Sequence, residues 1–144
     1  MQKLFFVLPA ALALLLCGCQ PPANTAVDAR ELKKAQQIEV IPAGETDATE
    51  IITGQGEIED FVETLDVPGW VLESLPDGAE PIGVFQLSQE ATLHPGQAET
   101  DGTLYDTAAL TLYDDGWLTL ETGGLDMAFS LQREAAGSLA AYFR

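Results

Sequence analysis

The chain has 144 residues, of which 47% are hydrophobic and 20% are charged, and this length suits one compact domain. Six Lys and Arg residues stand against 23 Asp and Glu residues, which gives a formal net charge of −17. Such a charge excludes a sequence-independent grip on nucleic acid and excludes membrane binding through a basic patch.

The N-terminal segment has the pattern of an export signal. Lys3 is its only charged residue, and the apolar run Leu4–Leu16 follows, interrupted only by Pro9. This run is shorter than the roughly 20 residues that a helix needs to cross a bilayer. We therefore expect a signal peptide and not a permanent membrane span.

The residues Leu16-Cys17-Gly18-Cys19 follow the apolar run, and they resemble the lipobox of bacterial lipoprotein precursors. The resemblance implies that residues 1–18 are removed and that the thiol of Cys19 receives a diacylglycerol group, which carries fatty-acyl chains such as palmitate; the new amino terminus can be acylated as well. Cleavage before Cys17 would place the bulky Leu16 at the cleavage site, so Cys19 is the preferred position. In the alternative interpretation, both cysteines are apolar signal residues or form a disulfide.

The lipid would place the mature protein on the extracytoplasmic side of the cell membrane. Acyl chains contribute about 0.8 kcal/mol per buried CH₂, so they hold a protein on a bilayer without basic residues. We interpret residues 19–36 as a lipidated tether because they contain Pro21 and Pro22 and few large apolar side chains. As a flexible coil this tether would reach roughly 20 Å. Gln20 permits sorting to an outer membrane, so the receiving membrane stays open.

Residues 37–144 are predicted to form a single acidic domain that begins with two strands and a helix. The alternating pattern predicts strands over Gln37–Ala43 and Glu50–Thr53. The period then changes, and a helix over residues 54–66 is expected, with Thr53 as its N-cap. Its apolar face would consist of Ile58, Phe61, Val62 and Leu65.

Two further strands are expected after the helix. Trp70–Leu75 and Ile82–Gln89 are separated by turn residues and are predicted to be neighbours in a meander, with Trp70 in the core. A long loop, Glu90–Thr107, follows.

The register of the next two hairpins can be predicted from which turn length places apolar residues opposite one another. A two-residue turn at Asp115-Gly116 would place Leu112 opposite Thr119 and mix apolar with polar faces. A three-residue loop, Asp114–Gly116, places Leu112 opposite Leu118 and is favoured. A second turn at Gly123-Gly124 then pairs two further sets of residues: Leu120 with Met127, and Glu121 with Asp126.

The C-terminal residues Arg133–Phe143 are predicted to form a helix, although Gly137 disfavours it by about 1 kcal/mol. The predicted fold class is α+β, with a mainly antiparallel twisted sheet, an amphipathic helix at about 54–66 and the C-terminal helix. This order of strand, acidic helix, antiparallel meander and apolar tail resembles small uncharacterised lipoprotein domains of Gram-positive bacteria. The resemblance implies an extracytoplasmic domain and no particular activity.

Catalytic and metal-binding motifs are scarce in this sequence. His94 is the single histidine, no serine lies in a G-x-S-x-G setting, and the predicted domain has no lysine. Only carboxylates are left for acid–base chemistry. The loop Gln97–Asp106 weakly resembles a calcium loop but lacks the acid at its first position and the glutamate at its twelfth. We therefore predict no catalytic residue, no metal site and no cofactor.

Tyr113 and Trp117 are the candidate recognition patch. The favoured register pairs them on the side away from the leucines, beside acidic residues, where aromatic rings suit a cationic or carbohydrate partner. They are alternatively a cross-strand pair that only stabilises the hairpin. The favoured function is a non-enzymatic binding or accessory module for a basic protein, peptide or envelope component. The alternatives are a carboxylate-dependent envelope glycan hydrolase and a structural component of an envelope complex.

Overall fold

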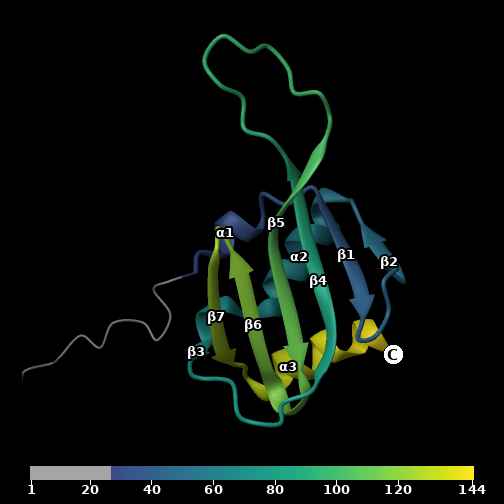
Figure 1. Cartoon of the computed structure of the whole chain (residues 1–144), viewed down its shortest axis with the longest axis vertical. Helices are drawn as coiled ribbons and strands as arrows, with labels where there is room; N and C mark the ends of the chain where they lie inside the picture. The colour runs from purple at the N-terminus through teal and green to yellow at the C-terminus, as the bar shows by residue number, and fades with distance from the viewer. Residues whose placement is uncertain (1–26) are drawn as a thin grey trace, which may run out of the picture.

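The computed structural model describes residues 27–144, and the predicted signal segment, lipobox and Cys19 lie outside the described residues. The described chain forms a seven-stranded antiparallel sheet with its helices packed on one face (Figure 1). The predicted α+β class is confirmed. None of the described helices is long and apolar enough to span a bilayer.

The sheet has the strand order β2-β1-β4-β5-β6-β7-β3. Its strands are β1 Gln37–Pro42, β2 Glu50–Ile52, β3 Val71–Leu72, β4 Pro81–Glu90, β5 Leu104–Tyr113, β6 Trp117–Thr122 and β7 Leu125–Ser130. The helices are α1 Ala29–Leu32, α2 Gln55–Leu65 and α3 Arg133–Ala140, and short 3₁₀ turns cover Val67–Gly69, Asp114–Gly116 and Ala141–Phe143.

Helix α2 confirms the helix predicted from the spacing of apolar residues. Its four buried side chains are the predicted ones, Ile58, Phe61, Val62 and Leu65. The predicted N-cap is wrong, because Gly54 and not Thr53 occupies that position and makes no side-chain capping bond. The acidic Glu57 lies in the first turn instead, where a negative charge favours the helix dipole.

Both predicted hairpin registers are confirmed. Leu112 pairs with Leu118 across the β5–β6 hairpin, and Leu120 pairs with Met127 across the β6–β7 hairpin. The three-residue loop contains two residues with positive φ, which are Asp115 at 58° and Gly116 at 81°. The loop length therefore fixes which side chains face the helices.

The predicted meander of Trp70–Leu75 with Ile82–Gln89 is wrong. Within Trp70–Leu75, only Val71–Leu72 forms a strand, β3, and it pairs with β7 at the sheet edge. The second predicted strand is β4, which lies between β1 and β5 and does not pair with β3. The physical reason lies at Trp70, which is fully buried and whose indole Nε1 donates to the Leu65 carbonyl at 2.7 Å. This contact holds the start of β3 beside the end of α2 and far from β4.

Strands β4 and β5 form a long hairpin that extends beyond the sheet (Figure 1). Strand β5 already begins at Leu104, so the loop is shorter than the predicted Glu90–Thr107. The register shifts between Leu87 and Ser88, where Thr107 has no partner across the ladder. We call residues 88–107 the arm.

An aromatic core fills the space between the helices and the sheet. Phe61 of α2 contacts Phe85 of β4 with ring centroids 4.8 Å apart, and Trp70 contacts Phe129 at 4.9 Å. The predicted C-terminal helix is confirmed as α3 and the turn after it, whose Phe143 contacts Phe85 at 4.8 Å. The end of the chain thus closes one end of the core.

The folded domain begins before Gln37, earlier than the predicted boundary. Helix α1 lies within the predicted tether, and Leu32 and Ala35 are buried in the core. The side chain of Asp28 caps α1 by accepting from the backbone amide of Arg30 at 2.9 Å. The basic residues around Leu32 concealed this short amphipathic pattern in the sequence.

Candidate functional site

The face of the sheet away from the helices, which we call the open face, carries the predicted recognition residues (Figure 1). Residues on the central strands alternate between buried positions under the helices and partly exposed positions on this face. Within the described residues no helix covers this side. Its outward positions on four strands include Glu39, Ile41, Val84, Gln86, Ala109, Thr111, Trp117 and Thr119.

Tyr113 and Trp117 are paired at one end of the open face. They are direct cross-strand partners, and both are partly exposed, while their neighbours Leu112 and Leu118 are buried. Ser130 of β7 pairs with Trp117, and Val71 of β3 pairs with Ser130. The register therefore makes a row of two aromatic side chains, a serine and a valine across three strands and the edge strand β3.

A second row across the open face is acidic. Glu121 and Asp126 are direct partners on β6 and β7, and the row continues through Ala109 and Gln86 to Glu39 on β1. Neighbouring strands lie about 4.8 Å apart, so the two paired carboxylates repel each other weakly. This cost disappears when a cation binds between them.

A shallow hollow of about 280 Å³ lies beside this acidic row. Gln86, Asp106 and Glu121 line it, together with the Gly123-Gly124 turn. The Asp106 carboxylate accepts a hydrogen bond from the buried hydroxyl of Ser88 at 3.0 Å, which fixes one oxygen. The hollow thus presents two carboxylates from different strands to solvent.

Positive side chains are absent from the strands of the described residues, and Arg133 at the start of α3 lines a hollow of about 550 Å³ together with Tyr113. Among residues 27–144, none of the seven strands contains Lys, Arg or His. The cations of these residues lie at α1, at α3 and at the C-terminal residue: Arg30, Lys33, Lys34, Arg133 and Arg144. The charges on the strands are therefore exclusively negative.

The cations near α1 already have acidic partners. Arg30 binds Asp28 at 2.9 Å, Lys34 binds Glu31 at 2.9 Å, and Lys33 lies 3.8 Å from Glu63 of α2. Hydrogen bonds from the Arg30 side chain hold the pKa of the Asp28 carboxyl below its ordinary value. These pairs are exposed, so each contributes little to stability.

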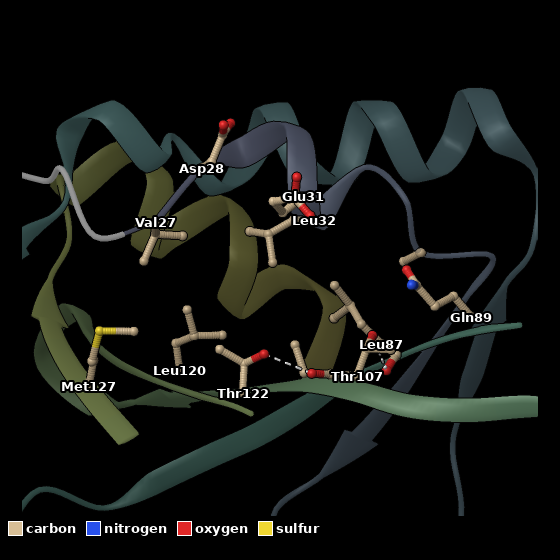
Figure 2. A pocket seen from close by; sticks show the side chains of 12 residues that line it. Val27, Asp28, Glu31, Leu32, Leu87, Gln89, Thr107, Leu120, Thr122 and Met127 are labelled. Atoms are coloured by element: carbon tan, nitrogen blue, oxygen red, sulfur yellow. Dashed lines mark hydrogen bonds between the residues drawn. The ribbon is translucent and has the colours of Figure 1, made fainter. Parts of the chain in front are cut away.

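A second hollow lies on the opposite face of the sheet, beneath α1 (Figure 2). Its volume is about 350 Å³. Figure 2 shows Val27 and Leu32 reaching toward the sheet, where Leu87 and Leu120 point back at them. Local sequence patterns carry no signal for this hollow, because it forms where α1 packs over four strands that lie far from α1 in the chain.

His94 and the predicted calcium-like loop lie in the arm. His94 is exposed, and its backbone amide donates to the Gln97 side chain at 3.0 Å. A hydrogen bond from the backbone amide of Thr103 lowers the pKa of the Asp101 carboxyl. Across residues 27–144 no group of three or more His, Cys, Asp or Glu side chains is placed to hold a metal ion.

The comparisons with known proteins give no family. No protein-family model matches the chain, and no curated protein matches it. Among solved structures, a thioesterase-like protein from Clostridium sporogenes ATCC 15579 is similar at 16% sequence identity with a TM-score of 0.44. The match covers 76% of this chain and 94% of that one.

Proposed function

We propose that the protein is a lipid-anchored, extracytoplasmic binding module that holds a basic protein or cationic peptide on its open face. The observation that carries the proposal is the separation of charge described above. In the described part of the chain the strands present only negative charges, and the cations lie on the helices and at the C-terminus. A cationic partner approaching the sheet is therefore attracted by the carboxylates and meets no positive side chain on the strands themselves; among the described cations, Arg133 lines a hollow with Tyr113 of the aromatic pair.

The two rows of the open face supply different contributions. The acidic row with Glu121, Asp126 and the adjacent Asp106 attracts Lys and Arg side chains. The row with Tyr113 and Trp117 adds ring faces, on which a cation gains about 0.5–1 kcal/mol at an exposed site. Charge would set the rate of encounter, and the aromatic row would select peptides that carry apolar residues beside their basic ones.

A binding experiment with matched variants tests the open face. A short fluorescein-labelled oligolysine is titrated with the mature chain and its fluorescence anisotropy is measured. Glu121→Gln combined with Asp126→Asn should weaken binding roughly two- to tenfold, as expected for two surface charge contacts. Glu59→Gln combined with Asp60→Asn on α2 removes the same charge from exposed helix positions and should have little effect. Equal losses in both double variants would contradict the proposal.

Ionic strength gives an independent measurement on the same complex. Raising NaCl from about 10 mM to about 150 mM shortens the Debye length from about 30 to about 8 Å. The affinity for oligolysine should then fall steeply. At either salt concentration, Trp117→Leu should bind oligolysine a few-fold more weakly than the unmodified chain does, because leucine keeps an apolar side chain but removes the ring face.

Metabolic labelling tests the anchor separately. Bacterial cells that express the full chain are grown with a fatty-acid analogue, and incorporation into the protein is measured. Cys19→Ser should abolish labelling, whereas Cys17→Ser should leave it intact, because residue 17 is removed with the signal peptide. Recovery of an unlabelled protein that contains Cys19 in the membrane fraction would contradict the assignment.

A further inference from the structure

The hollow beneath α1 has the size and position of a small-molecule site. Its volume of about 350 Å³ lies at the lower end of the range for ligand pockets. The floor consists of side chains from β4, β5, β6 and β7, and α1 with the residues around it forms the wall. Because it is on the helix-covered face, it is separate from the proposed partner surface.

The lining of the hollow selects for a flexible aliphatic guest. None of the residues that line it is aromatic, so it has no ring against which a planar ligand would stack. Aliphatic side chains lie above and below the space, with Val27 and Leu32 above and Leu87 and Leu120 below, while polar side chains lie at its rim and sides (Figure 2). Met127 adds an unbranched thioether that adapts its shape to a guest.

The hydroxyl groups of the two threonines in the lining already donate hydrogen bonds to backbone carbonyls. Thr107 Oγ1 donates to the Leu87 carbonyl at 3.2 Å, and Thr122 Oγ1 donates to the Thr107 carbonyl at 2.9 Å (Figure 2). Among the lining side chains, the amide of Gln89 at one end of the hollow is then the donor left for a guest. This favours a hydrocarbon segment over a polar molecule of the same size.

The charge at the rim determines which head group the chain carries. Asp28 and Glu31 border the hollow, each already paired with its own cation on α1, and the protein carries a net charge of −17. No Lys or Arg is among the residues that line the hollow, so an anionic head group would find no cation in the lining, whereas a cationic head group would face these two carboxylates.

We infer that the hollow beneath α1 binds a single aliphatic chain attached to an uncharged or cationic head group. The chain has two possible sources, a separate amphiphile or the acyl group on Cys19 of the same protein. The second source is within reach because Val27 itself lines the hollow, and the residues between it and Cys19 span at most about 28 Å when extended. The inference of an aliphatic site does not depend on the basic partner of the open face.

The test uses the mature chain with Cys19→Ser, which carries no lipid, and isothermal titration calorimetry. Decyltrimethylammonium, decanol and decanoate present one chain with a cationic, a neutral and an anionic head. We expect the first two to bind and decanoate to bind at least tenfold more weakly. Among shorter alkyltrimethylammonium probes, affinity should rise about fourfold per added CH₂ until the hollow is filled. Equal or stronger binding of decanoate would overturn the inference.

A matched pair of variants locates the binding. Ala108 is buried and lines the hollow, whereas its neighbour Ala109 lies on the open face. Ala108→Leu should reduce the affinity for decyltrimethylammonium at least tenfold, and Ala109→Leu should leave it unchanged. Val27→Trp narrows the hollow from a half-buried position and gives the same loss if Ala108→Leu proves unstable. Binding that survives these changes would overturn the inference.

The lipidated protein purified from membranes distinguishes the two sources. If its own acyl chain fills the hollow, decyltrimethylammonium binding is lost in the lipidated protein and retained in the Cys19→Ser chain. If both forms bind the probe, the natural guest is a separate amphiphile. Either result supports the aliphatic site, and the absence of binding to both forms contradicts it. Oligolysine binding to the open face is measured in parallel on the same proteins. The aliphatic site and the basic partner of the open face are thereby tested independently of each other.

Discussion

Trp70 joins the end of α2 to the last strands of the sheet. Its indole is fully buried, donates to the Leu65 carbonyl at 2.7 Å and packs on the ring of Phe129. If a buried carbonyl loses its hydrogen-bond donor, the folded state is destabilised by most of the free energy needed to remove that carbonyl from water. This one side chain therefore combines apolar burial with the satisfaction of a helix-end carbonyl.

Replacing Trp70 by Phe should lower the free energy of unfolding by about 2–3 kcal/mol. The change leaves the Leu65 carbonyl without its donor and opens space beside Phe129. The same substitution at Trp117, which is partly exposed on the open face, should cost less than about 1 kcal/mol. Urea unfolding of both variants measures the difference, and similar costs would contradict the role given to Trp70.

Ionisation of Tyr142 should lower the stability of the folded protein at alkaline pH. Burial raises the pKa of the Tyr142 phenol above its ordinary value, and nearby carboxylates such as Glu50 and Asp60 add to the effect. The folded state then keeps a proton that the unfolded state loses, so stability should fall as pH rises above about 10. Tyr142→Phe should reduce this fall, whereas Tyr105→Phe in the exposed arm should not. Thermal unfolding between about pH 8 and 11 measures it.

At the scale of elements, local signals predicted the parts of the fold that depend on neighbours in sequence. The tight turns after Tyr113 and Thr122 fix the register of two hairpins, and the apolar period identifies α2. The position of β3 depends on a contact between Trp70 and Phe129, which are distant in the chain, and local patterns contain no information about it. Helix α1 was missed for a different reason, because its four residues are too few to show a helical period and basic residues surround its one buried leucine.

The packing of α1 is testable through Leu32, which is 6% exposed. Leu32→Ala should lower the free energy of unfolding by about 2–3 kcal/mol, because it removes apolar contacts between α1 and the sheet. Lys34→Ala, at an exposed position of the same segment, should change it by less than about 0.5 kcal/mol. If Leu32 belonged to a free tether, both variants would unfold at the same urea concentration as the unmodified chain.

For the candidate site, the pairing of Tyr113 with Trp117 and of Glu121 with Asp126 was predictable from turn lengths. The hollow that joins Asp106 to Glu121 was not, because it depends on the register shift at Ser88. The hollow beneath α1 was equally inaccessible, since its lining comes from α1 and four strands. Sites made by one hairpin are accessible to sequence reasoning, and sites made by several elements require the assembled fold.

At the scale of the whole molecule, repulsion among carboxylates opposes folding. The net charge is −17, and the ion pairs of the described residues are exposed. Salt screens the repulsion more than it weakens these few pairs. Raising NaCl from about 10 to about 150 mM at pH 7 should therefore increase the free energy of unfolding, on the order of 1 kcal/mol. Near the isoelectric point of about 4.1, this salt effect should vanish.

The placement of the cations on α1 and at the C-terminal end has a consequence for proteolysis. Between Lys34 and Arg133 the chain offers no bond to an enzyme that cuts after basic residues, even along the exposed arm. A trypsin-like protease that cut after Lys34 and after Arg133 would release residues 35–133 as one fragment. This fragment keeps the seven strands and the open face, but it loses α1 and with it the wall of the hollow beneath α1.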